Sequence, residues 1–211
     1  MTMNEQLFLN GAPELQNDTM LPEYAMYEDS SGVSEHRLST LHLAEGRLFI
    51  RGDITPDTAV RFSSSLLYLA KEKIPVRIYI NSGGGEINSG LIMYDAIQDY
   101  PGDLEIYCIG RAASMAAVLL AGGRKGKRYL LPHSQVMIHE PLIASGYGGS
   151  ASTIEKTAKS ILEVRDTLNS IIAKHTGHTL REVNKATETD CWMTAEEAVR
   201  FGICDEIRSM Y

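Results

Sequence analysis

From Arg47 onward, short apolar runs alternate with segments whose apolar residues recur at helical spacing. Runs rich in β-branched and aromatic residues predict strands at 47–51, 76–80, 104–109, 128–131, 135–139 and 203–207. Apolar positions three and four residues apart predict helices between Pro56 and Pro75, and at 87–97, 115–121, 152–175 and 194–201. Strands that alternate with helices in this way indicate an α/β fold with largely parallel pairing.

The helix expected at 152–175 is unusually long for this chain. At about 1.5 Å per residue it would reach roughly 36 Å, which exceeds what a compact domain of 211 residues requires. We therefore expect it to project from the domain and to pack on another surface.

The chain before this pattern differs in character. Residues 10–36 are polar and rich in turn-forming residues, so we expect an extension rather than core. The predicted organisation is an N-terminal extension over 1–36, followed by one domain over 37–211.

Charge and cysteine content exclude several classes of protein. Lys and Arg number 20 against 27 Asp and Glu, a net charge of −7, which argues against a binder of nucleic acid or of anionic membranes. Cys108, Cys191 and Cys204 are odd in number and lack C-x-x-C spacing, so a disulfide framework and a zinc knuckle are not expected. A reducing cytoplasm fits these cysteines, and no apolar run approaches the ~18 residues that would span a bilayer.

Ser114 stands where a strand ends and an apolar helix begins. It can be an ordinary N-cap. The same place also suits a nucleophile, because a helix N-terminus stabilises negative charge and its free N–H groups can face an oxyanion.

His139 ends the strand at 135–139, and it too permits two interpretations. It can be a surface or core histidine without a function. However, the carboxyl ends of parallel strands gather functional groups, and Ile80, Gly110 and His139 all mark such ends.

Gly83-Gly84-Gly85 follows the strand at 76–80. It lacks the sequence of a P-loop and of G-x-G-x-x-G. It is either a plain strand-to-helix turn or a run that presents backbone N–H groups, as an oxyanion hole requires.

Two further motifs are assigned to structure. His175-x-x-His178 resembles a metal motif, but Gly177 between them indicates a helix C-terminus. The basic run 124–128 predicts a solvated turn or a subunit contact. We predict no metal and no cofactor.

Taken together, three segments in order resemble the ClpP family of self-compartmentalising serine peptidases. They are residues 79–85 (YINSGGG), 110–115 (GRAASM) and 136–141 (VMIHEP), and the similarity extends from about Phe49 to Ile207. The resemblance implies the ClpP/crotonase-like fold, a repeated β-β-α spiral with a projecting handle helix at about 152–175.

The resemblance also implies the site residues. Ser114 would be the nucleophile, His139 the general base and Asp190 the third member of the triad. The backbone N–H groups of Gly85 and Met115 would form the oxyanion hole.

The implied assembly is a heptamer or tetradecamer of identical chains, in which residues 1–36 are the axial segment. Its implied partner is a Clp-type AAA+ ATPase unfoldase such as ClpX, ClpA or ClpC, and its substrates are unfolded polypeptides cut to short peptides. Two alternatives stay open. Thr189, where the family usually has Arg, and the divergent N-terminus favour a mainly structural or regulatory subunit of a mixed ring. A crotonase-type acyl-CoA enzyme would need a carboxylate, for which Glu86 is the nearby candidate.

Overall fold

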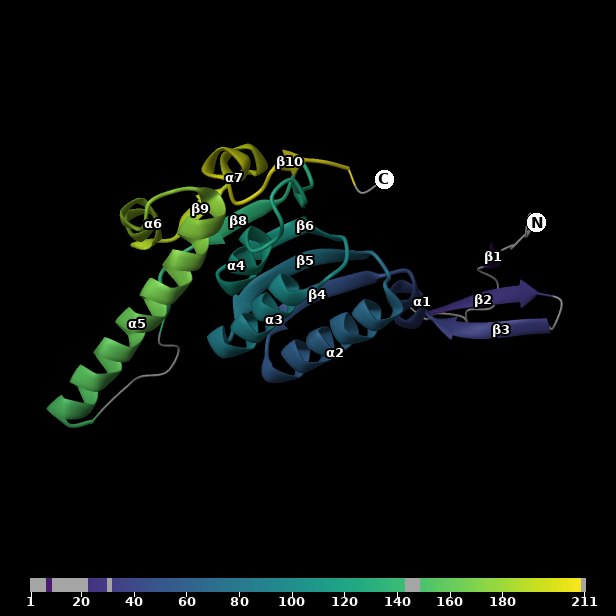
Figure 1. The fold of residues 1–211 in the computed structure, drawn as a ribbon, viewed down its shortest axis with the longest axis horizontal. Coiled ribbons are helices and arrows are strands. Elements are labelled where there is room, and N and C mark those ends of the chain that lie inside the picture. The colour runs from purple at the N-terminus through teal and green to yellow at the C-terminus, as the bar shows by residue number, and fades with distance from the viewer. Residues whose placement is uncertain (1–6, 9–22, 30–31, 143–148, 210–211) are drawn as a thin grey trace, which may run out of the picture. The chain divides into compact units, whose positions relative to one another are not determined.

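The computed structural model describes residues 7–8, 23–29, 32–142 and 149–209. Its contacts divide the chain into two compact units, residues 1–47 and 48–211, and Figure 1 draws their elements along the chain. The predicted division into 1–36 and 37–211 stays a prediction, and much of 1–36 lies outside the described residues.

The first unit is a small antiparallel arrangement. Its elements are β1 (Leu7–Phe8), β2 (Tyr24–Asp29), β3 (Gly32–Arg37) and α1 (Leu38–Ala44). Both β1 and β3 pair with β2 in antiparallel register, and all of β3 is exposed. The polar composition of 10–36 did not predict the strands β2 and β3.

The second unit carries the rest of the elements. In chain order they are β4 (Arg47–Ile54), α2 (Pro56–Glu72), β5 (Val76–Gly85), α3 (Ile87–Asp99), β6 (Leu104–Ala113), α4 (Met115–Ala121), β7 (Arg128–Leu130), β8 (Gln135–Ile138), α5 (Ala151–Thr176), α6 (Leu180–Thr187), β9 (Cys191–Met193), α7 (Ala195–Phe201) and β10 (Glu206–Ile207). The α/β fold predicted from the hydrophobic pattern is confirmed.

The sheet of this unit runs β10-β7-β6-β5-β4. Strand β6 is long enough to serve two neighbours: residues 106–108 pair with β7 and residues 111–113 pair with β8, both in parallel. Strand β9 then adds to β8 in antiparallel register. The carboxyl ends of β5, β6 and β8 therefore converge.

The two faces of the sheet bury different side chains. Ile78, Ile80 and Ile106 are fully buried, on the face that period-2 alternation directs toward the helices. The alternate positions carry aromatic rings that stack across the strands, with centroids 5.0, 5.4 and 4.8 Å apart, in the order Phe49, Tyr79, Tyr107, Tyr129.

Helix α4 lies in the centre of the unit, and all seven of its residues are buried. Its Ala-rich sequence lets it approach the backbone of β5 and β6 closely. A helix that is apolar on all sides is stable only when it is enclosed, so α4 is a rigid element on which to mount Ser114.

Helix α5 confirms the projecting helix expected at 152–175. It spans 26 residues and extends away from the sheet in Figure 1. Its buried residues, Leu168, Asn169 and Ile172, lie in the C-terminal third, and Gly177 ends it in the left-handed conformation with φ 83°. The helix-end interpretation of His175-x-x-His178 is thus confirmed.

Helix α6 was missed by the hydrophobic pattern, because it carries few apolar residues. A capping box between Thr179 and Glu182 begins it, and this T-x-x-E signal was readable in the sequence.

The basic run 124–128 also differs in part from the predicted solvated turn or subunit contact. Arg128 is 2 % exposed and pairs with Asp205 at 2.6 Å, so this member of the run is a core residue and not part of a solvated turn.

Candidate active site

Ser114 sits on a strained turn between β6 and α4. Its backbone has φ 54° and ψ −126°, a region that costs a residue with a side chain about 1–3 kcal/mol. Although it occupies the N-cap position, its side chain makes no capping hydrogen bond to the described residues. The N-cap interpretation therefore does not account for this serine.

His139 is brought to Ser114 by strand register. Ala113 pairs with Met137 across β6 and β8, and the Ser114 N–H donates to the Met137 carbonyl at 2.8 Å. Because the next residues along both strands emerge together, His139 Nε2 lies 2.8 Å from Ser114 Oγ. The histidine side chain is 14 % exposed.

Asp190 reaches the other side of the same imidazole. Ile138 pairs with Cys191 in the antiparallel β8–β9 ladder, which places Asp190 opposite His139. The His139 Nδ1 to Asp190 Oδ1 distance is 3.4 Å, and the carboxylate is 61 % exposed. This distance is longer than that of a well-formed N–H···O hydrogen bond. The carboxylate therefore attracts the imidazole electrostatically but does not fix its orientation through a short hydrogen bond.

The glycine run ends β5 directly against the serine turn. A Cβ on Gly84 (φ +97°) would lie 2.8 Å from Ser114 Cβ and 3.0 Å from the Met115 nitrogen, so a side chain is excluded there. A Cβ on Gly85 (φ +151°) would lie 2.3 Å from the Ile54 carbonyl oxygen. Glycine is needed at both positions for close backbone approach.

Two backbone amides belong to the segments that meet at this turn. The Met115 N–H belongs to the first turn of α4, where helix amides have no partner within the helix. The Gly85 N–H belongs to the strand end that packs against this turn. The structure thus brings Ser114, His139, Asp190, Gly85 and Met115, the five residues named from the sequence, to one edge of the sheet.

Two further reactive side chains lie near this edge, Cys191 and Glu86. Burial, with the charge of Glu197, raises the pKa of the Cys191 thiol, so it stays protonated and is a poor nucleophile. The Glu86 carboxylate accepts a hydrogen bond from the Ser89 hydroxyl. Among the described residues no group of three His, Cys, Asp or Glu side chains could hold a metal ion.

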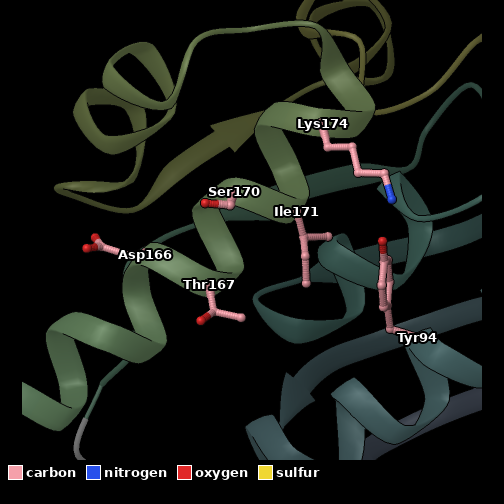
Figure 2. Close-up of a pocket in the computed structure, with 6 residues that line it drawn as sticks. All are labelled: Tyr94, Asp166, Thr167, Ser170, Ile171 and Lys174. Atoms are coloured by element: carbon pink, nitrogen blue, oxygen red, sulfur yellow. The ribbon is translucent and has the colours of Figure 1, made fainter.

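A separate hollow of about 530 Å³ lies between α3 and α5. Figure 2 shows Tyr94 on one side and Asp166, Thr167, Ser170, Ile171 and Lys174 along α5 on the other. None of the five site residues lines it.

Thr187 makes two hydrogen bonds that support the site and that the sequence did not predict. The Glu140 N–H donates to the Thr187 carbonyl at 2.9 Å, and the buried Asn169 amide donates to the Thr187 hydroxyl at 3.0 Å. Thr187 therefore links Asn169, in the C-terminal third of α5, to Glu140, the residue that follows His139.

The comparison with protein-family models bears on the whole of this arrangement. The model described as Clp protease matches residues 31–210, which is more than half of the chain. The resemblance and the fold class that it implied are confirmed.

Within the part of the chain that the structure describes, no helix is both long and apolar enough to cross a membrane.

Proposed function

The chain belongs to the Clp protease family and is a peptidase, and from that premise we propose that it is a serine endopeptidase whose nucleophile is Ser114. The observation that carries the proposal is the 2.8 Å contact between Ser114 Oγ and His139 Nε2, made by a serine on a strained strand-to-helix turn. Strain of this kind is maintained only where the surrounding structure imposes it.

In the first step, His139 Nε2 accepts the Ser114 proton while Oγ attacks the carbonyl carbon of the scissile peptide. A neutral hydroxyl is a weak nucleophile, and a base within hydrogen-bond reach activates it. The buried side of the imidazole keeps water away from this proton transfer, since only 14 % of the side chain is exposed.

The attack places negative charge on the former carbonyl oxygen. The N–H groups of Gly85 and Met115 donate to this oxyanion, and the N-terminus of α4 adds its positive dipole end. Their value lies in being fixed before the reaction, which the buried α4 and the glycine contacts with Ser114 support.

The intermediate then collapses. The peptide C–N bond breaks as the imidazolium returns its proton to the leaving amine, and an acyl ester remains on Ser114. Water, deprotonated by the same imidazole, attacks the ester and releases the acid. Asp190 orients the ring and stabilises the imidazolium that forms in both halves, and its 3.4 Å contact shortens when substrate is bound.

The proposed assembly is a heptamer or tetradecamer that encloses these sites. Much of α5 lies outside the core of its own unit, and it carries exposed apolar residues, with Ile154 54 % and Leu162 47 % exposed. Apolar side chains displayed along a projecting helix favour contact with another copy. We expect light scattering to give the mass of such a ring, and a monomer or dimer would contradict this.

A closed chamber explains how such a site is restrained. Short peptides would enter unaided, whereas a folded protein must first be unfolded at a cost of about 5–15 kcal/mol. We propose that a Clp-type AAA+ ATPase supplies that work, and that the protein acts in a reducing cytoplasm, which its three free thiols favour.

The test is labelling with a serine-directed fluorophosphonate, followed by peptide mapping. We expect one labelled serine, Ser114, and no labelling of Ser114→Ala. The matched control Ser64→Ala, at an exposed position on α2, should label like the wild type. Absence of labelling in the wild-type protein would instead favour a structural or regulatory ring subunit.

A further inference from the structure

Ser82 is a buried serine directly before the glycine run. The register between β5 and β6 shifts between Ile80 and Ser82, and a bulge of this kind re-aims the side chains beyond it. The result is that Ser82 is only 1 % exposed. A buried hydroxyl is costly unless it is hydrogen-bonded, so its partners determine its role.

The Ser82 hydroxyl joins two strands. It donates to the Gly52 carbonyl of β4 at 2.6 Å and accepts from the Gly84 N–H at 3.0 Å. One hydroxyl therefore connects the glycine run of β5 to the backbone of β4.

The segment just beyond Ser82 is held at both ends. Gly84 is fixed by Ser82, and the Glu86 N–H donates to the Ile54 carbonyl at 2.8 Å. The Gly85 N–H lies between these two anchors, in a stretch whose glycines have φ angles of 97° and 151°. Without the first anchor, Gly84 regains the wide range of conformations that glycine permits.

We propose that Ser82 is a positioning residue that orients the Gly85 N–H toward the oxyanion. The proposal rests on the proposed function and assigns a part of the same site that acts through Gly85, without touching substrate. Because the oxyanion exists only after attack, loss of this orientation should reduce kcat and leave KM nearly unchanged.

The experiment compares Ser82→Ala with a matched control, Ser134→Ala. Ser134 is 2 % exposed, donates to the Cys108 carbonyl at 2.8 Å and accepts from the Gly110 N–H at 2.9 Å. The two serines thus make the same pair of hydrogen bonds, but only Ser82 holds the glycine run. Ser82→Cys serves as a second, isosteric variant, since a thiol is a poor hydrogen-bond partner.

We expect kcat for a short peptide reporter to fall about 10- to 100-fold in Ser82→Ala and Ser82→Cys, somewhat less than loss of an oxyanion donor itself. The KM should stay within about threefold, and affinity for a peptide boronate, whose tetrahedral adduct places an oxygen in the hole, should fall by the same factor as kcat. Ser82→Thr, which retains the hydroxyl, should recover most of the rate. Ser134→Ala should lose thermal stability but keep kcat within about threefold.

Two results would overturn the proposal. One is a kcat and boronate affinity in Ser82→Ala and Ser82→Cys equal to those of the wild type. The other is an equal loss of kcat in Ser134→Ala, which would make the effect one of general stability. Neither touches the proposed function, which instead fails if the wild-type protein shows no hydrolysis and no labelling at Ser114.

Discussion

Within the described part of the chain, two histidine–hydroxyl pairs have the same length. His139 Nε2 lies 2.8 Å from Ser114 Oγ, and His175 Nε2 lies 2.8 Å from the Tyr94 hydroxyl. The first joins two strand ends at the edge of the sheet, and the second joins α3 to the last turn of α5. A short contact between an imidazole and a hydroxyl is therefore not sufficient to indicate catalysis.

The surroundings of the two rings differ in charge. A carboxylate, Asp190, faces His139, and in the proposed mechanism it would stabilise the imidazolium that proton transfer creates. Around His175 the charges are positive: burial, followed by the charges of Lys174 and Arg128, lowers the pKa of His175. The nearby carboxylate of Asp205 is engaged by Arg128.

The hydroxyls differ as well. Ser114 is on a strained turn at the N-terminus of α4, whereas burial, with the charge of Asp95, raises the pKa of the Tyr94 phenol and makes its ionised form less accessible. The comparison teaches that the helix N-terminus, the strain and the carboxylate distinguish the proposed catalytic pair from a structural one.

The largest effect should come from removing one hydroxyl of each pair. Ser114→Ala should lower kcat for a peptide reporter by a factor on the order of 10⁴ or more, because triad members act as a unit. Tyr94→Phe should keep kcat within about threefold and lose thermal stability, because the Tyr94 hydroxyl makes a hydrogen bond that joins α3 to α5 and lies outside the proposed active site. Steady-state kinetics and thermal unfolding check both. A similar loss of kcat in the two variants would contradict the assignment.

The next effect concerns the carboxylate that sets His139 apart. Asp190→Asn should lower kcat about 10²- to 10³-fold, because an amide cannot stabilise the imidazolium. The loss should be smaller than the ~10⁴ known for a buried triad aspartate, since Asp190 is 61 % exposed. Glu188→Gln, a neighbouring exposed acid, should change kcat less than twofold. Equal rates for Asp190→Asn and wild type would remove Asp190 from the site.

How much of this comparison the sequence could predict depends on the kind of contact. The three motifs located Ser114, His139 and Gly85, because strand ends and glycine runs are local signals. The pairing of His139 with Asp190 came from resemblance, since antiparallel register between β8 and β9 cannot be read from either strand alone.

The Tyr94–His175 pair, and the Arg128–Asp205 pair near it, could not be predicted from the sequence. Arg128 belongs to a basic run that predicts a solvated turn or a subunit contact, yet it is buried and pairs with Asp205, which is 77 residues away in the sequence. Likewise, nothing local marked Tyr94 as the partner of His175, which is 81 residues away. Buried polar pairs depend on tertiary packing, and local pattern carries no information about it.

A third effect tests what holds the structural pair in place. Arg128 donates to Asp205 through Nε at 2.9 Å and a terminal nitrogen at 2.6 Å, and also to the His175 carbonyl at 3.1 Å. Breaking a buried pair by removing one charge costs about 3–5 kcal/mol, so Asp205→Asn should lower the free energy of unfolding by about 3 kcal/mol. The exposed pair Arg165–Asp166 is the control, because Asp166→Asn should cost less than about 1 kcal/mol. Urea denaturation distinguishes them, and equal losses would contradict the difference in burial.

The same pair predicts acid sensitivity. Burial alone would raise the pKa of Asp205, but the hydrogen bonds and charge of Arg128 outweigh it and lower the pKa. Its contribution to stability is therefore present above the pKa of an unfolded aspartate and is lost as the pH falls through the lower folded value. The acid unfolding curve of Asp205→Asn should be flatter than that of wild type below about pH 4.

The smallest effect concerns the titration of His175 itself. Since its pKa is lowered in the folded state, the unfolded chain binds a proton at a pH where the folded chain does not. Stability is therefore unaffected at high pH, declines as the pH falls through the unfolded histidine's pKa, and reaches its full loss below the folded one. Asp205 stays ionised over this range because its pKa is lowered. Of His175 and Asp205, only His175 therefore changes its charge over this range.

His175→Gln removes this proton and retains an amide that can meet the Tyr94 hydroxyl. As the pH falls through the pKa of an unfolded histidine, the wild type should lose more unfolding free energy than the variant does. His133→Gln, at an exposed turn, should leave the wild-type slope unchanged. If His175→Gln followed the wild-type slope, the cations around His175 would not govern its protonation, and the contrast in charge between the two histidine sites would be lost.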